Sequence, residues 1–148
     1  MNIQYKVLKA SSVEELQKII QLRVKILRAP WKQPAETATD EFESNAINAY
    51  VLNDLNAVIA CGRLQINSEE TGQIRFMAVD ENYQGLGLGK HILSFLEEEV
   101  KKINLKYIEL QARENAVSFY EKNGYHIVEK SFLLWGIIQH FKMVKKIN

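Results

Sequence analysis

Apolar residues recur at the helical period in three parts of the chain. These parts predict helices over Val13 to Leu27, Leu88 to Ile103 and Ala116 to Asn123. Ser12 stands just before the first helix and three residues before Glu15, which is the spacing of a capping box. Gly124 is well placed to end the third helix.

Between the helices, shorter apolar runs are bounded by turn-forming residues, a pattern typical of β-strands. The predicted strands are Gln4 to Leu8, Ala49 to Leu52, Ala57 to Ile66, Gln73 to Val79, Tyr107 to Ala112, Tyr125 to Phe132 and Ile137 to Val144. Hairpins and helical connections are both present, so we expect an α/β (α+β) fold with a mixed sheet. No linker or repeat interrupts the order, which indicates one domain over residues 1–148.

The segment from Ala29 to Glu43 fits neither period and holds both prolines of the chain, so a loop or broken helix is expected there. Long loops in compact domains often carry function. The C-terminal end of the segment holds a group of candidate carboxylates: Asp40, Glu41 and Glu43. Arg63 and Arg75 lie inside apolar strands, where a charge should be paired, so we expect them to line a cleft or to meet these carboxylates.

Composition narrows the class of protein. The chain has 148 residues, 47% hydrophobic and 25% charged, with a net charge of +1, so nothing suggests a nucleic-acid or membrane partner. No apolar run approaches the roughly 20 residues of a membrane span, and no signal core precedes Lys9, so a cytoplasmic protein is expected. Cys61 is the single cysteine, and the three histidines, expected as surface or packing residues, show no metal-ligand spacing; no metal is predicted.

The most informative stretch follows the predicted strand that ends in Met77-Ala78-Val79. It reads Gln84-Gly85-Leu86-Gly87-Leu88-Gly89-Lys90, with glycine at every second position before a helix. Such a loop exposes backbone N–H groups at a helix N-terminus and predicts an anion site. The spacing fits neither a Walker A loop nor a dinucleotide fingerprint, which leaves a pyrophosphate loop for coenzyme A.

Two motifs in order carry a resemblance to a known family. Gln84 to Gly89 matches the Q/R-x-x-G-x-G/A motif of the GNAT family of N-acetyltransferases, and Phe119-Tyr120-Glu121-Lys122-Asn123-Gly124-Tyr125 resembles its second hallmark, F-Y-x-x-x-G-F/Y. The regions Leu22 to Glu43 and Gly136 to Met143 resemble the ElaA/YjcF-like branch. The resemblance implies a GNAT-type fold, with a mostly antiparallel sheet of six or seven strands and about four helices.

The resemblance also implies acetyl-CoA as co-substrate. The pantetheine arm would pair with the strand holding Met77, Ala78 and Val79, and the glycine loop would hold the pyrophosphate. The implied coenzyme-binding residues are Met77, Ala78, Val79, Gln84, Gly85, Leu86, Gly87, Leu88, Gly89, Lys90 and Asn115. Asn115 is the nearest match to an asparagine that many relatives carry two positions earlier, where this chain has Arg113.

The implied reaction is direct attack of an amine on the thioester. Tyr120 matches the family's general acid, and a phenol of pKa about 10 can protonate a thiolate of pKa about 8.5. A backbone N–H near Val79 could polarise the carbonyl. The general base is open among Glu109, Asp40, Glu41, Glu43 and a water chain.

The acceptor is also open: a small molecule or a protein amine would both fit, and a homodimer is common for this fold. Two alternatives to an acetyltransferase remain at this point. One is a coenzyme A-binding sensor or interaction module without turnover, and the other is a transferase of longer acyl chains.

Overall fold

The structure is a computed structural model that describes residues 4–148. Within that range the chain forms one seven-stranded sheet with three α-helices and five short 3-10 helices. The strands are β1 (Val7–Lys9), β2 (Ile47–Leu52), β3 (Val58–Ile66), β4 (Thr71–Val79), β5 (Tyr107–Arg113), β6 (His126–Leu134) and β7 (Ile138–Lys146). The α-helices are α1 (Val13–Leu27), α2 (Leu88–Lys102) and α3 (Val117–Lys122). The 3-10 helices are η1 (Ala29–Trp31), η2 (Ala35–Ala38), η3 (Glu43–Asn45), η4 (Glu81–Tyr83) and η5 (Glu114–Ala116).

The sheet has the strand order β1-β2-β3-β4-β5-β7-β6. Each neighbouring pair is antiparallel except β4 and β5, which run parallel. The predicted mixed, mostly antiparallel sheet is therefore confirmed. The parallel pair needs a crossover, and α2 supplies it.

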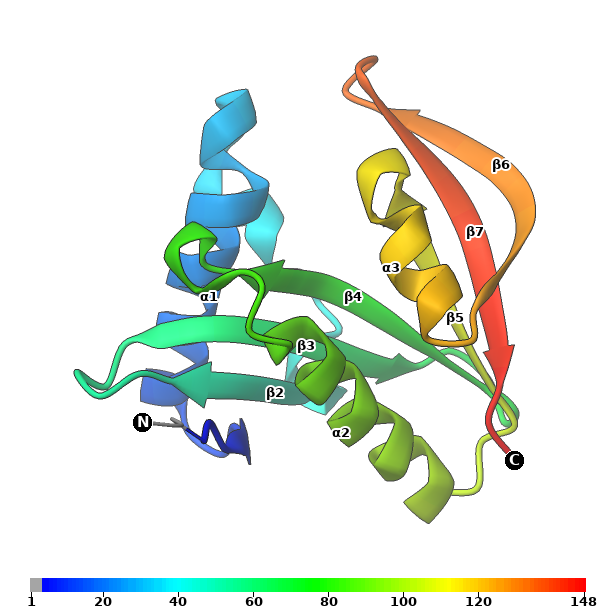
Figure 1. The fold of residues 1–148 in the computed structure, drawn as a ribbon, viewed down its shortest axis with the longest axis horizontal. Helices are drawn as coiled ribbons and strands as arrows, with labels where there is room; N and C mark the ends of the chain where they lie inside the picture. The colour runs from blue at the N-terminus through cyan, green and yellow to red at the C-terminus, as the bar shows by residue number, and fades with distance from the viewer. Residues whose placement is uncertain (1–3) are drawn as a thin grey trace.

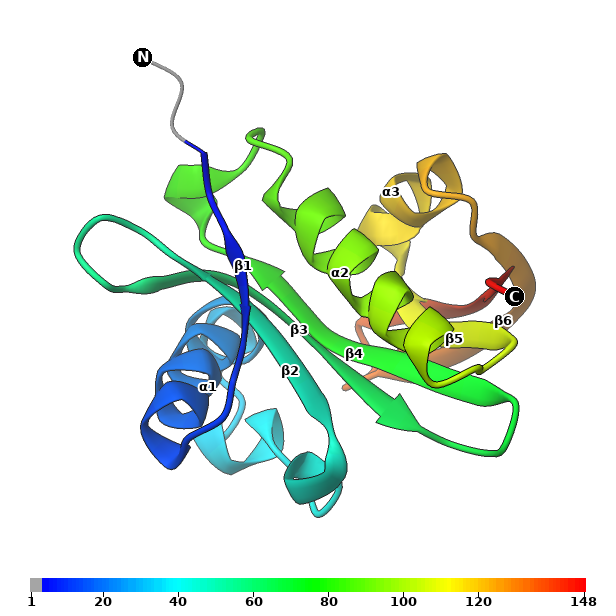
Figure 2. The same cartoon turned by 90° about the horizontal axis from the view of Figure 1, so that it is seen from below.

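The helices cover the two faces of the sheet (Figure 2). On one face, α1 buries Ile19 and Leu22 against a cluster that includes Tyr50 and Cys61. On the other, α2 buries its apolar stripe in the larger core, which also holds Tyr120 of α3. No helix in the described part of the chain is both long and apolar enough to cross a membrane.

The local signals located the helices well. The helix α1 has the predicted bounds, and its cap is formed as expected, because the Glu15 N–H donates to Ser12 Oγ at 3.2 Å. The strand β1 differs, since it begins at Val7 rather than at Gln4. The segment predicted as a loop or broken helix contains η1 and η2, and η3 begins at its last residue.

The strands β4 and β5 stay paired over only four residues each. Thr71–Ile74 faces Tyr107–Leu110, and beyond these residues the two strands separate while β4 stays on β3 and β5 on β7. Figure 1 shows the half-sheet of β5, β6 and β7 turning away from the half-sheet of β1 to β4. Backbone atoms that would be paired in a continuous sheet are thus available in the gap.

Candidate active site

A cavity of about 320 Å³ lies where β4 and β5 separate. The separated ends of both strands, the C-terminal end of α1, and parts of α3, β6 and β7 contribute to its wall. The side chains that matter for chemistry are Arg28, Arg75, Met77, Arg113, Tyr120 and His140. The cavity therefore reaches both halves of the sheet and both of its faces.

Tyr120, the predicted general acid, lies in this wall. Its side chain is 7% exposed, and its ring packs edge-on against Phe119 and Tyr125, with centroids 5.0 and 5.8 Å away. Its hydroxyl makes no hydrogen bond to any residue in the range 4–148. Burial raises the pKa of Tyr120, so the phenol keeps its proton at neutral pH. A protonated, uncommitted hydroxyl in a cavity is what a general acid requires.

The predicted anion loop has open backbone geometry. Gly85 and Gly87 have φ of +83° and +78°, a region that L side chains rarely adopt. Gly87 is the N-cap of α2 and has no capping side chain, and the first helical bond runs from His91 N–H to the Gly87 carbonyl at 3.1 Å. The N–H groups of Leu88, Gly89 and Lys90 thus precede the helical ladder, as an anion site at a helix N-terminus requires.

A β-bulge in β4 sets the sides on which its last residues point. Phe76 has a φ of +56°, and the pairing with β3 shifts register there. As a result Ala78 packs in the α1 cluster, while Met77 and Val79 pack in the α2 core. Met77 also lines the cavity, so this end of β4 passes directly beside it.

The other predicted coenzyme contacts are exposed. Gln84 and Leu86 lie in the glycine loop, Lys90 lies in the first turn of α2, and Asn115 lies on the surface in η5. Asn115 is not among the residues of the cavity wall. Its role toward the coenzyme stays a prediction.

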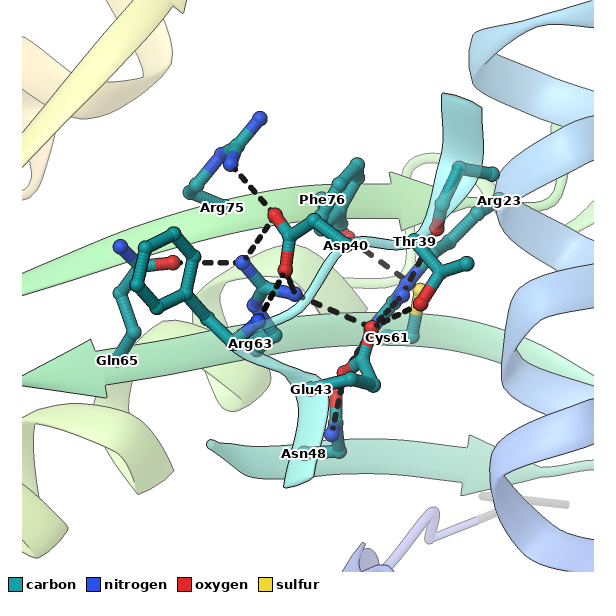
Figure 3. Close-up of polar contacts among 12 residues, drawn as sticks. Arg23, Thr39, Asp40, Glu43, Asn48, Cys61, Arg63, Gln65, Arg75 and Phe76 are labelled. Atoms are coloured by element: carbon teal, nitrogen blue, oxygen red, sulfur yellow. Dashed lines mark hydrogen bonds and ion pairs between the residues drawn. The ribbon is translucent and has the colours of Figure 1, made fainter. Parts of the chain in front are cut away.

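The expected pairing of buried arginines with loop carboxylates is confirmed (Figure 3). Arg63, fully buried, donates to both oxygens of Asp40 at 2.8 and 2.9 Å and to Glu43 at 3.1 Å. Arg75 donates to Asp40 at 2.8 Å. Arg23, also fully buried, donates to Glu43 at 2.7 Å. These ion pairs and hydrogen bonds hold the segment between α1 and β2 against the sheet.

These contacts bear on the candidate bases. Burial alone would raise the pKa of Asp40, but Arg63 and Arg75 hold it below its usual value. Glu109 accepts from Asn67 at 2.6 Å and pairs with Lys142 at 3.6 Å, in the part of β5 still paired with β4. Glu41 is exposed. The cavity wall includes none of these three residues, Asp40, Glu41 and Glu109.

His140 is a cavity residue that the sequence did not indicate. It is 5% exposed, and its ring stacks on Phe132 at 4.4 Å. Its Nδ1 lies 3.0 Å from the Ile138 carbonyl, which can only accept, so Nδ1 carries the proton and Nε2 has the lone pair. Burial lowers the pKa of His140, and the charge of Arg113 lowers it further. No local pattern marks it, because its neighbours come from other strands.

Arg28 and Arg113 were also not identified as site residues. They are 85 positions apart, yet both donate to the Leu27 carbonyl, at 3.0 and 3.1 Å. The Arg113 guanidinium lies over the Trp31 ring at 4.5 Å, and that of Arg28 over the Trp135 ring at 5.4 Å. The two tryptophans hold these cations beside the cavity.

Comparison with known proteins gives consistent results. A sequence model of the acetyltransferase (GNAT) family matches residues 16–125. The N-acetyltransferase YjcF of Bacillus subtilis is 29% identical over 137 residues, which cover 92% of this chain and 96% of YjcF. The crystal structure of Escherichia coli ElaA superposes with a TM-score of 0.83 at 19% identity, covering 96% of this chain and 99% of ElaA. A GNAT acetyltransferase from Elizabethkingia anophelis, solved with acetyl-CoA bound, superposes with a TM-score of 0.74 at 17% identity, covering 96% and 97% of the two chains.

Proposed function

The chain belongs to the acetyltransferase (GNAT) family and is an acyl-CoA-dependent N-acetyltransferase; from this premise we propose that it moves the acetyl group of acetyl-CoA directly onto a primary amine in the cavity between β4 and β5. The observation that carries the proposal is that Tyr120 is buried in the wall of that cavity and that its hydroxyl makes no hydrogen bond to residues 4–148.

Acetyl-CoA would bind along the end of β4. The N–H groups of Leu88, Gly89 and Lys90 would hold the pyrophosphate, since they lack helical acceptors and stand at the positive end of the α2 dipole. Lys90 would add a point charge, and a Cβ at Gly89 would make a tight contact of 3.3 Å with the Phe119 ring, which favours glycine there. The pantetheine arm would pair with backbone of Met77, Ala78 and Val79 in the gap that β5 leaves open. The relative from Elizabethkingia anophelis supports this coenzyme, because its structure contains acetyl-CoA.

In the proposed reaction, the amine nitrogen attacks the thioester carbonyl and forms the new C–N bond. The C–S bond breaks, and the departing thiolate takes the proton of Tyr120. A backbone N–H near Val79 would stabilise the developing oxyanion. The step needs no redox partner, and the products are the acetylated amine and free coenzyme A.

The attacking amine must lose a proton, and His140 is the base that we propose. Among the titratable groups of the cavity wall, the three arginines and Tyr120 hold their protons at neutral pH. His140 is kept neutral by its lowered pKa, and its Nε2 has the free lone pair. Asp40 and Glu43 are already paired with arginines, and Glu41 is exposed outside the cavity wall.

Calorimetric titration with acetyl-CoA, and separately with ATP and NAD, tests the coenzyme site. We expect selective binding of acetyl-CoA, and release of coenzyme A when amines are added. Gly87→Glu should abolish the binding, because it places a carboxylate at the N-cap of α2 where φ is +78°. Val13→Glu is the matched control, since it adds the same charge to the first turn of α1 at a residue that is 67% exposed. Absence of acetyl-CoA binding by the wild type would refute the proposal.

A further inference from the structure

The cavity wall is strongly electropositive. Arg28, Arg75 and Arg113 all contribute to it, and no carboxylate from residues 4–148 does. Five guanidinium groups gather around this region, and the carboxylates of Asp40 and Glu43 form ion pairs with three of them, Arg23, Arg63 and Arg75. The five are Arg23, Arg28, Arg63, Arg75 and Arg113. Positive charge therefore remains in excess around the cavity.

Arg28 and Arg113 are the unneutralised members. Among residues 4–148, no carboxylate forms an ion pair with either of them. Arg28 is only 8% exposed and uses neutral acceptors, Thr37 and Leu27. Arg113 donates to the same Leu27 oxygen, so two cations converge on one carbonyl. Arg28 is buried and Arg113 is half-buried, and charges removed from water are normally paired, so an anion bound beside them would be stabilised.

The pKa values of Arg28 and Arg113 are consistent with two partly buried cations that repel each other. Burial lowers the pKa of Arg113 to about 10, and the charge of Arg28 adds to the effect. Burial likewise lowers the pKa of Arg28, with the charges of Arg75 and Arg23 contributing. Both groups stay charged at neutral pH, so an anion bound between them would relieve their repulsion. The tryptophan contacts keep both guanidinium planes in place beside the cavity.

We propose that Arg28 and Arg113 form a carboxylate-binding subsite, and that the acceptor is a small amine carrying a carboxylate, of the amino-acid class. This inference rests on the proposed function and names its substrate class. Guanidinium groups bind carboxylates with two parallel hydrogen bonds, which would orient the acceptor as well as attract it. The cavity volume of about 320 Å³ suits a small acceptor. A polycationic acceptor, which the loop carboxylates could have served, would meet like charge here.

The experiment compares acceptors in matched pairs. One member of each pair has a carboxylate, and the other has the corresponding carboxamide in its place. Pairs such as 4-aminobutyrate and its amide keep the two groups several bonds apart, so the basicity of the amine changes little. Phosphoethanolamine beside ethanolamine tests whether a phosphate serves instead. Release of coenzyme A gives kcat/KM, and calorimetric titration of the protein saturated with coenzyme A gives the affinity for each member of a pair.

We expect the wild type to favour the acid over its amide, in turnover and in affinity. Arg113→Gln should lower that preference about ten- to a hundredfold, through KM rather than kcat, because one charged hydrogen-bonding partner is lost. Arg28→Gln should act in the same way, and Arg113→Lys should restore part of the preference. Lys18→Gln, which removes an exposed positive charge on α1, should leave the preference unchanged.

Two results would overturn the subsite. One is equal use and equal affinity of the acid and the amide by the wild type. The other is a preference that neither arginine variant changes. Preference for phosphoethanolamine over the acceptors with a carboxylate would assign the subsite to phosphate and overturn the amino-acid class. In each case acetyl-CoA would still bind and Gly87→Glu would still abolish that binding, which distinguishes this failure from failure of the proposed function.

Discussion

At the scale of single residues, Tyr120 and Tyr125 form an informative pair. Their rings lie 5.8 Å apart in one aromatic cluster, and both are buried. The Tyr125 hydroxyl donates to Glu97 at 2.9 Å, whereas Tyr120 lines the cavity and its hydroxyl makes no hydrogen bond to any described residue. The same chemical group therefore has a structural role at one position and is available for chemistry at the other.

Tyr120→Phe should lower kcat about 10²- to 10⁴-fold, because the departing thiolate loses its acid. The dissociation constant of acetyl-CoA should change little, since the ring stays in place. Tyr125→Phe is the control: it should keep kcat but reduce the free energy of unfolding by about 1 kcal/mol through the lost hydrogen bond. Steady-state kinetics, calorimetry and urea unfolding measure these effects. Full activity in Tyr120→Phe would show that the residue only packs, and would revive the sensor alternative.

His140 predicts a pH dependence of its own. A base must be deprotonated to act, and the lowered pKa of His140 keeps it so at and somewhat below its ordinary value of 6.5. The acidic limb of kcat/KM due to this group should therefore lie below pH 6.5. His140→Gln should remove that limb and reduce kcat/KM about a hundredfold, whereas exposed His126→Gln should do neither. A pH–rate profile that is the same in wild type and His140→Gln would eliminate His140 as the base.

At the scale of elements, one carboxylate fastens the segment that joins α1 to β2. Glu43 accepts from Arg23 at 2.7 Å, Arg63 at 3.1 Å, Asn48 at 2.9 Å and Thr39 at 2.9 Å. Burial alone would raise the pKa of Glu43, but these partners, Arg23 foremost, lower it to about 2. Because Arg23 and Arg63 are fully buried, loss of this charge would leave two cations short of a partner.

The stabilisation from Glu43 should be fully present above pH about 4.5 and should be lost as the pH falls toward 2, because the folded state holds the carboxylate ionised over that window. The loss amounts to about 3 kcal/mol. Glu43→Gln should lower the free energy of unfolding at pH 7 by a similar amount and flatten the dependence between pH 4.5 and 2. Urea unfolding at several pH values measures both effects, with exposed Glu36→Gln as control. An unchanged pH dependence in Glu43→Gln would contradict this assignment.

The elements themselves were largely predictable from local sequence. The capping serine and the apolar period gave the bounds of α1, and the glycine spacing gave the N-terminus of α2. The bulge at Phe76 was not predictable, because nothing in Gln-Ile-Arg-Phe-Met marks a residue with positive φ; it depends on the pairing with β3. Nor was the subsite of Arg28 and Arg113, since its members meet only where the C-terminal end of α1 reaches Arg113 of β5 and the hairpin that carries Trp135.

At the scale of the whole molecule, the chain is two half-sheets joined by a short parallel pairing. The strands β1 to β4 form one half, and β5, β7 and β6 form the other, with four paired residues on each side of the junction. The strand spacing along the chain indicated a mixed sheet but not that β7 would lie between β5 and β6, because long-range pairing leaves no local pattern. The separation of the halves creates the cavity, so the coenzyme in our proposal would bridge them.

If acetyl-CoA bridges the two half-sheets, its binding should raise the stability of the folded state and slow amide hydrogen exchange. Acetyl-CoA at about 100 times its dissociation constant should stabilise the folded state by about 2.7 kcal/mol, which for a chain of this size raises Tm by about 5–10 °C. Amide exchange should slow in Met77–Val79 and Leu88–Lys90, where backbone groups would meet the coenzyme, and much less in β2, which lies away from the gap. Gly87→Glu should show neither effect at the same acetyl-CoA concentration. Protection confined to β1 and β2 would place the coenzyme elsewhere, and the separation of β4 and β5 would then need another explanation.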